Sequence, residues 1–298
     1  MPLGISIEPT NSCNLKCKEC PTGMEILMRK KGKMELPLFK QAVDDLSNYL
    51  TNIIFNFQGE PFLNPSLFEM IEYASKKKIY SITSTNGHFL KKENSDKSIK
   101  SGLNKLIISL DGTTQEVYEK YRVNGSLSKV LEGVKTVVSS KKEAKSQLPK
   151  VVLQFLVTGE NEHQINEAKI IASKLEVDKI VFKSAQIYDF KNGSPLIPQN
   201  PKFSRYKQQP NGTYKIKSKL KNRCWRMWSQ PVITATGDVL PCCFDKDAKY
   251  KMGNLKENSF REIWHSENYL DFRKKVFSDR KSIDICKNCT EGLFKIYG

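Results

Sequence analysis

The chain has 298 residues, of which 39% are hydrophobic and 27% charged, so we expect a packed globular protein rather than a disordered one. No apolar run reaches the roughly 18 residues of a membrane helix, and the start lacks the pattern of a signal peptide, which together predict a cytoplasmic protein. The formal net charge is +17, but the basic residues are scattered and do not alternate with aromatic ones. This distribution favours a lysine-rich surface over a nucleic-acid-binding face.

The first two-thirds of the chain alternates strand and helix patterns. Strands are expected at 4–9, 53–61, 80–87, 104–112, 150–158 and 179–186, and helices at 65–78, 113–122, 126–140 and 161–176. Helical connections of this length imply parallel strands joined by right-handed crossovers. The pattern therefore predicts an α/β fold, a partial (β/α)6 TIM-like barrel, with its chemistry at the C-terminal ends of the strands.

The last third of the chain has a different character. Residues 189–223 are rich in Pro, Asn, Gly and Lys and predict a long loop. Beyond them, residues 232–243 predict a β-hairpin that turns at Thr-Gly-Asp, and 258–278 predict one or two helices. We therefore expect two domains, a core at 1–205 and a small cysteine-rich domain at 206–298.

Three of the eight cysteines lie close together near the start of the chain. Cys13, Cys17 and Cys20 have the spacing C-x3-C-x2-C. A loop of this kind can ligate three irons of a [4Fe–4S] cluster and leave the fourth iron open to a small molecule. A structural zinc site is the alternative, but it prefers four protein ligands, and this loop offers three. The spacing therefore favours a cluster.

A C-x3-C-x2-C loop directly after a first strand resembles the radical S-adenosylmethionine (SAM) superfamily. The resemblance implies that SAM binds the open iron, is cleaved reductively, and yields a 5′-deoxyadenosyl radical that abstracts hydrogen from a substrate. It also implies an electron donor such as flavodoxin or ferredoxin. In chain order, the resemblance assigns SAM binding to the following residues: Gly59, Glu60, Asn86, Ser109, Asp111 and Arg122.

The resemblance also implies which SAM groups the Gln-Gly-Glu-Pro stretch and Arg122 would bind. Gly59 and Glu60 lie in a Gln-Gly-Glu-Pro stretch, where the family has a Gly-Gly-Glu-type motif that holds the SAM amino group. Arg122 would pair with the SAM carboxylate, a task that suits the planar guanidinium fork. Taken alone, each polar residue is more typical of a turn or a cap.

The late cysteines form a second pattern. Cys224 and Cys242 flank Gly237 as C-x12-G-x4-C, and Cys286-x2-Cys289 follows. This arrangement resembles the auxiliary-cluster region of the SPASM and twitch subfamilies, and it implies a second [4Fe–4S] cluster on these four cysteines. A structural zinc site with the same ligands is the alternative.

Several neighbours of this second pattern carry expectations of their own. Cys243 is not needed for this set of four ligands. Its alternative roles are a small buried hydrophobic side chain, a ligand in place of Cys242, or a ligand in a differently arranged cluster. Trp225 and Trp228 are expected to pack over the cluster and exclude water.

These patterns together predict a radical SAM oxidoreductase, or a peptide- or sugar-modifying enzyme of that family. The leading reactions are dehydrogenation of an alcohol or amino sugar and modification of a peptide, with the auxiliary cluster accepting an electron or positioning the substrate. The alternatives are a cluster- or zinc-bearing nucleic-acid-binding module and an RNA-modifying radical SAM enzyme. The sequence identifies no general base. His88 follows a strand end and could face the active site, but His88, His163 and His265 are each expected to be ordinary surface or capping residues.

Overall fold

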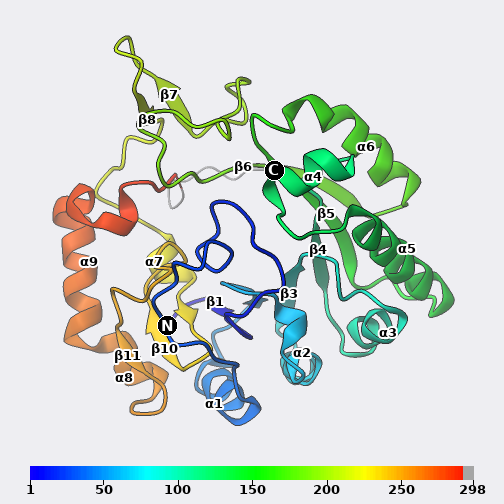
Figure 1. The fold of residues 1–298 in the computed structure, drawn as a ribbon. Helices are drawn as coiled ribbons and strands as arrows, with labels where there is room; N and C mark the ends of the chain where they lie inside the picture. Colours follow the sequence, from blue (N-terminus) through cyan, green and yellow to red (C-terminus); the bar gives the residue numbers. More distant parts are fainter. Residues whose placement is uncertain (291–298) are drawn as a thin grey trace. The chain divides into compact units, whose positions relative to one another are not determined.

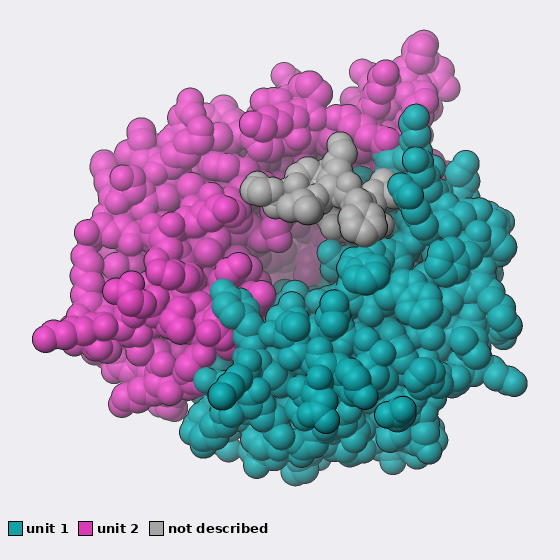
Figure 2. All heavy atoms as spheres, turned by 180° about the vertical axis from the view of Figure 1, so that it is seen from behind, with its two compact units in different colours: residues 1–12, 27–80, 218–298 teal, residues 13–26, 81–217 magenta. Residues whose placement is uncertain are grey.

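The computed structural model describes residues 1–290 and divides the chain into two compact units (Figure 2). The first unit comprises residues 1–12, 27–80 and 218–298, and the second comprises 13–26 and 81–217. Within the described residues, no helix is both long and apolar enough to cross a membrane.

The first unit is built around a short buried strand. This strand, β1 (Gly4–Ile7), pairs in parallel with β2 (Asn52–Phe55) and β9 (Val232–Ile233). All four of its residues are buried, as expected for a strand covered on both faces. The hairpin predicted at 232–243 is confirmed, because β10 (Asp238–Leu240) runs antiparallel to β9 and to β11 (Gly253–Asn254).

The helices of the first unit begin and end at recognisable signals. Ser259 and Glu262 form a capping box at the start of α8, and Lys76 lies in the last turn of α2, where the helix dipole favours a cation. The region predicted at 258–278 forms two helices, α8 and α9. The helices among the described residues of this unit are α1 (Leu36–Leu46), η1 (Pro61–Leu63), α2 (Leu67–Lys76), α7 (Arg226–Ser229), α8 (Phe260–His265), α9 (Glu267–Asp279), η3 (Arg280–Ser282) and η4 (Asp284–Cys286).

The second unit carries the alternating strands and helices of the middle of the chain. Its strands pair in parallel in the order β3 (Tyr80–Thr85), β4 (Lys105–Ser109), β5 (Lys150–Val157) and β6 (Lys179–Ser184), and β3 begins at the last residue of the first unit. Helices α3, α5 and α6 cover one face of these strands (Figure 1). The helices are α3 (Lys92–Lys100), α4 (Gln115–Tyr121), α5 (Leu127–Glu143), η2 (Glu162–Gln164) and α6 (Ile165–Lys174). The predicted α/β class is confirmed.

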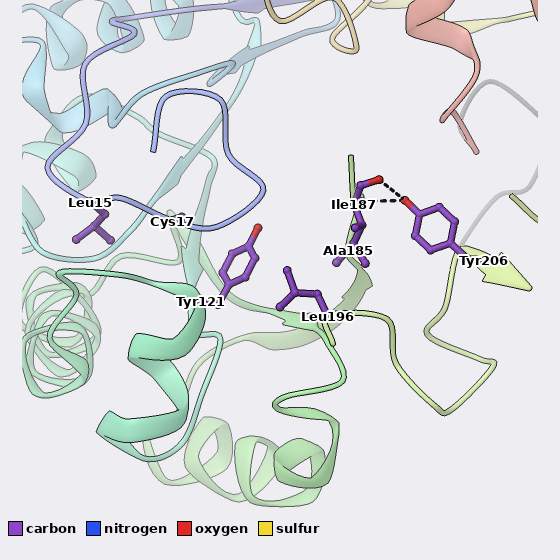
Figure 3. Close-up of a cluster of buried hydrophobic side chains, with 7 residues drawn as sticks. All are labelled: Leu15, Cys17, Tyr121, Ala185, Ile187, Leu196 and Tyr206. Carbon is purple, nitrogen blue, oxygen red and sulfur yellow. Dashed lines mark hydrogen bonds between the residues drawn. The ribbon is translucent and has the colours of Figure 1, made fainter. Parts of the chain in front are cut away.

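Part of the predicted loop at 189–223 is ordered as a hairpin. Strands β7 (Tyr206–Gln208) and β8 (Tyr214–Ile216) pair antiparallel around a turn that contains Gly212. The Tyr206 hydroxyl accepts the N–H of Ile187 at 2.8 Å and donates to its carbonyl at 3.1 Å (Figure 3). The prediction of a long loop was therefore wrong for this hairpin, because its strands are too short to give a periodic pattern.

Candidate functional site

The loop that carries Cys13, Cys17 and Cys20 is folded tightly on itself. The backbone N–H of Met24 donates to the carbonyl of Cys20 at 2.8 Å. A Cβ atom on Gly23 would lie 2.5 Å from the nitrogen and 2.6 Å from the oxygen of Cys17. A glycine at this position therefore lets the chain turn back over Cys17.

The segment that ends α4 holds the middle of this cysteine loop. The N–H groups of Lys16 and Lys18 donate to the carbonyls of Val123 and Tyr121, at 3.0 and 3.1 Å. Figure 3 shows Cys17 and Tyr121 in one buried cluster of the second unit, and Leu15 belongs to the same cluster. The cysteine loop is therefore fixed to α4 by backbone hydrogen bonds and by apolar packing.

Asp111 and Arg122 form an ion pair beside this loop. Arg122 Nε donates to Asp111 Oδ2 at 2.5 Å, and the other oxygen of Asp111 accepts the N–H of Leu156 at 2.8 Å. Arg122 Nη1 lies 3.6 Å from the sulfur of Cys17. Burial alone would lower the pKa of Arg122, but the Asp111 carboxylate and the Cys17 thiol raise it well above its usual value. Ser109 is buried at the end of β4 nearby in the chain.

Asn86 reaches the cysteine loop from the end of β3. Its Nδ2 donates to Asn14 Oδ1 at 2.7 Å and lies 3.9 Å from the sulfur of Cys13. His88 holds the Asn86 side chain in place, because the backbone N–H of His88 donates to Asn86 Oδ1 at 3.0 Å. The ring nitrogen Nε2 of His88 accepts the backbone N–H of Ser126 at 2.9 Å. The ring thus caps the chain at the start of α5, as the sequence predicted for a capping histidine.

Gly59 and Glu60 lie in the first unit, on the turn that follows β2. Gly59 has φ +74°, and a Cβ on it would lie 2.3 Å from the carbonyl oxygen of Thr10. The N–H of Glu60 donates to the carbonyl of Ser12, the residue before the first cysteine, at 2.8 Å. This turn is therefore held against the segment that leads into the cysteine loop.

The four late cysteines assigned to a second cluster line one cavity of the first unit. Cys224 comes from the segment before α7, Cys242 follows β10, and Cys286 and Cys289 lie at the end of the described chain. Apolar side chains and two arginines complete the lining: Arg226, Met227, Phe244, Phe272, Val276, Arg280 and Ile285. Cys243 packs against the buried cluster of Phe57, Val232 and Leu240, and its sulfur lies 3.5 Å from Arg226 Nη1.

The expected cover of this cavity by two tryptophans was wrong. Trp225 is 54% exposed, and Trp228 packs edge-on against Trp264 and under the guanidinium of Arg273, 4.3 Å from its ring centre. Met227 takes the inward position instead. Because α7 spans a single turn, its residues point in different directions, and Arg226 and Met227 line the cavity in place of the two tryptophans.

Two arginines of these regions were not singled out by the sequence. Arg29 makes a two-pronged ion pair with the fully buried Glu8, at 2.9 and 2.7 Å, and its Nε donates to the carbonyl of Lys246 at 2.6 Å. Arg280 lies in the cysteine cavity. Each arginine directly precedes a lysine in the sequence, so both look like ordinary surface residues. A signal existed only for Glu8, an acidic residue at the end of an apolar strand.

The donor chemistry at both places fits iron–sulfur clusters. Thiols are the ligands of such clusters, and N–H groups directed at the sulfurs adjust their potentials. Arg122, Asn86 and the N–H of Leu15, at 3.5 Å from the sulfur of Cys13, supply such donors at the first loop. Across residues 1–290, no three His, Cys, Asp or Glu side chains are grouped as a ready site for a single metal ion.

Comparison with known families agrees with this chemistry. The model of the radical SAM superfamily matches residues 7–169, more than half of the chain. The chain belongs to the radical SAM superfamily. The model of the SPASM iron–sulfur cluster-binding domain matches residues 224–290, which hold the late cysteines. The protein is therefore a radical SAM enzyme that uses SAM and a [4Fe–4S] cluster, with a SPASM region for auxiliary iron–sulfur binding.

Individual radical SAM relatives align with most of the chain. The S-adenosyl-L-methionine-dependent 2-deoxy-scyllo-inosamine dehydrogenase of Niallia circulans is 24% identical over 96% of this chain and 91% of its own length. The antilisterial bacteriocin subtilosin biosynthesis protein AlbA of Bacillus subtilis is 28% identical over 89% of this chain and 60% of its own length. The crystal structure of BtrN with AdoMet and 2-DOIA superposes with a TM-score of 0.59 at 22% identity, covering 98% of this chain and 94% of that one. The last likeness supports the fold.

Proposed function

We propose that the enzyme reductively cleaves SAM at a cluster held by Cys13, Cys17 and Cys20 and abstracts hydrogen from a small organic molecule or a peptide. The observation that carries this proposal is the convergence of Arg122 and Asn86 on the thiols of that loop, at 3.6 and 3.9 Å. When bound, SAM and the cluster supply a 5′-deoxyadenosyl radical.

The polar residues around the loop have separate tasks in this proposal. Asp111 fixes the Nε side of Arg122, so that the other end of the guanidinium is presented in one orientation to the SAM carboxylate. Glu60, which is buried and tied to Ser12, binds the SAM amino group with its carboxylate. Gly59 allows the close approach of that turn, while Asn86 and Ser109 bind polar groups of SAM.

A two-electron dehydrogenation of an alcohol or amino sugar is the reaction that we favour. The likeness to the inosamine dehydrogenase, which spans nearly the whole of both chains, supports it. Cys224, Cys242, Cys286 and Cys289 would hold the auxiliary cluster, which would supply an acceptor for the electron left after hydrogen abstraction, while the hydroxyl or ammonium proton leaves to water. Peptide modification is the second candidate, supported by the likeness to the subtilosin biosynthesis protein, of which this chain spans 60%.

The remaining assignments follow from this chemistry. We propose a catalytic domain at 1–205, an auxiliary-cluster domain at 206–298, and a flavodoxin or ferredoxin as electron donor. The cytoplasm is the compartment that we favour, because it keeps the eight thiols reduced. Membership of the radical SAM superfamily makes a nucleic-acid-binding module the weaker interpretation.

Anaerobic reconstitution with iron and sulfide tests the proposal. With dithionite and SAM, the enzyme should form 5′-deoxyadenosine, and Cys13→Ala should abolish this product while Cys243→Ala keeps it. Iron should approach about eight atoms per chain for two [4Fe–4S] clusters, whereas about four atoms with one zinc would indicate a structural C-terminal site. Absence of 5′-deoxyadenosine, or its formation by Cys13→Ala, would exclude the proposed activity.

The substrate class can be separated in the same assay. With a substrate deuterated at the reacting carbon, deuterium should appear in 5′-deoxyadenosine. The first probe is 2-deoxy-scyllo-inosamine, for which ketone formation would support dehydrogenation. Deuterium transfer from a peptide alone would instead favour the second candidate.

A further inference from the structure

Arg280, the first residue of η3, is a buried cation inside the cavity of late cysteines. Its side chain is 1% exposed, and it is the largest fully buried side chain of the described chain. Nη2 lies 3.5 Å from the sulfur of Cys289, while Nη1 donates to the carbonyl of Arg223 at 2.8 Å. Arg223 directly precedes Cys224, so one guanidinium joins the two segments that bring cysteines into the cavity.

The cavity around this guanidinium is lined by the four late cysteines and by apolar side chains such as Phe272 and Val276. A buried charge is costly unless an opposite charge compensates it. A cluster held by four thiolates is anionic and becomes more so when it accepts an electron, so it supplies such a charge.

We propose that Arg280 is a positioning residue for the auxiliary cluster, holding the Cys224 and Cys289 segments together and stabilising the reduced cluster with its positive charge. This inference rests on the proposed assignment of Cys224, Cys242, Cys286 and Cys289 as ligands. The positive charge of Arg280 would also favour electron acceptance by the cluster, because a fixed cation beside the sulfurs stabilises the more negative, reduced form.

The backbone around Arg280 makes this position specific. Its own N–H donates to Asn222 Oδ1 at 3.1 Å, which draws η3 toward the segment before Cys224. The planar fork of arginine reaches a carbonyl and a sulfur at once. The next residue, Lys281, is exposed and carries the same charge, so it offers a matched comparison.

An EPR-monitored redox titration of the reconstituted full chain tests the inference. The variants are Arg280→Met and Arg280→Lys, with Lys281→Met as the control for loss of one positive charge. In Arg280→Met, the ratio of reduced to oxidised auxiliary cluster at a fixed potential should fall about tenfold, which is a shift of about 59 mV downward for a one-electron couple. Arg280→Lys should keep most of the wild-type ratio, and Lys281→Met all of it.

The second cluster signal of the wild type separates the possible failures. That signal is identified as the auxiliary cluster by its loss in Cys289→Ala, and the signal of the first cluster should titrate identically in every variant. If the wild type shows no second signal, the ligand assignment fails, and this inference fails with it. If the signal is present and Arg280→Met titrates like Lys281→Met, only the role of Arg280 is disproved.

If Arg280→Met loses the iron of the auxiliary cluster, Arg280→Lys tests the role of the positive charge. Retention of both clusters by Arg280→Lys would then support the need for a cation at this position. Loss of the auxiliary cluster from Arg280→Lys as well would overturn the assignment of a charge effect, because that variant keeps the positive charge.

Discussion

A guanidinium nitrogen lies beside a thiol at each of the two cysteine sites. Arg122 Nη1 is 3.6 Å from the sulfur of Cys17, and Arg280 Nη2 is 3.5 Å from that of Cys289. The two arginines differ in their other contacts, because Arg122 is also paired with the carboxylate of Asp111, while Arg280 donates to the carbonyl of Arg223. The carboxylate partly cancels the first cation. Arg280 should therefore have a larger electrostatic effect on a cluster at the second site than Arg122 has on one at the first.

The Asp111–Arg122 pair should be important for stability even without a cluster. Asp111 is fully buried, and Asp111→Asn would leave Arg122 without its anionic partner. Breaking a buried ion pair by removing one charge costs about 3–5 kcal/mol. We expect the free energy of unfolding of the cluster-free protein, measured in urea, to fall by about 3 kcal/mol.

A double variant provides the control for this change. Asp111→Asn combined with Arg122→Met removes both charges and should recover part of the loss. A decrease below about 1 kcal/mol in Asp111→Asn would contradict a role for the pair in stability.

His88 should make stability depend on pH. Burial lowers its pKa below the usual 6.5, against the hydrogen bond to Asn86, and its Nε2 must stay unprotonated to accept the N–H of Ser126. The unfolded chain then binds the proton more readily, so stability is fully present above pH 6.5 and is lost as pH falls through the pKa of the folded state.

Urea unfolding at a series of pH values from about 7.5 to about 5 tests this dependence. The slope due to one proton is at most about 1.4 kcal/mol per pH unit. His88→Gln keeps an acceptor for Ser126 but does not titrate, so it should show a smaller decrease. An identical pH dependence in both proteins would assign the effect to other groups.

At the scale of single elements, the turns after the strands decide where the site residues lie. The turn after β2 carries Gly59, whose φ of +74° and contact with Thr10 bring Glu60 to Ser12. The cysteine loop needs Gly23 for a similar reason, since its chain passes directly over the backbone of Cys17. Both turns depend on the absence of a side chain.

Gly59→Ala should therefore lower the free energy of unfolding more than an alanine at a glycine that also has a positive φ but has free space around its Cα. Gly212 has φ +81°, and a Cβ atom on it would meet nothing within 4 Å, so Gly212→Ala should lose only about 1–2 kcal/mol from backbone strain. Gly59→Ala should lose more, and because its turn is tied to Ser12, it should also lower the iron bound in the first loop. Thermal unfolding and iron analysis of both variants would measure this, and equal effects would argue against crowding.

Much of this element-level structure could be predicted from the sequence. Alternating apolar runs and helical periodicity predicted strands β3 to β6 and helices α4, α5 and α6, and the hairpin turn at 236–238 was correct. Helix α3 (Lys92–Lys100) was missed, because its sequence is almost entirely polar and has no apolar stripe. The spacing of Cys13, Cys17 and Cys20 also placed them in one loop, because three cysteines within eight residues cannot lie far apart.

Other features depend on contacts between distant segments, which local patterns do not encode. Arg280 lies 57 residues from Arg223, and Arg29 lies 21 residues from Glu8, yet each pair is in direct contact. A basic residue beside lysines looks exposed in the sequence, whether or not a fold buries it. The orientation of Trp228 was wrong for the same reason, since one turn of helix has no periodicity that could assign an inward face.

At the scale of the whole chain, the two cysteine sets belong to different compact units. Residues 13–26 are part of the second unit, whereas residues 218–298 are part of the first. Each set has neighbours from its own unit: Tyr121 and Arg122 at the first loop, and Met227, Phe272 and Arg280 at the second cavity. The packing that shapes one site therefore does not have to include the ligands of the other.

Each cluster should consequently assemble when the other is removed. In Cys286→Ala, iron should fall from about eight to about four atoms per chain, the first cluster should keep its EPR signal, and 5′-deoxyadenosine should still form with dithionite and SAM. In Cys17→Ala, iron should again fall to about four, but SAM cleavage should be lost while the auxiliary signal remains. Since the auxiliary cluster is proposed to take the second electron, Cys286→Ala should also lose oxidised product while still consuming SAM. Loss of all iron from either variant would show that the two sites assemble together, in spite of their separate surroundings.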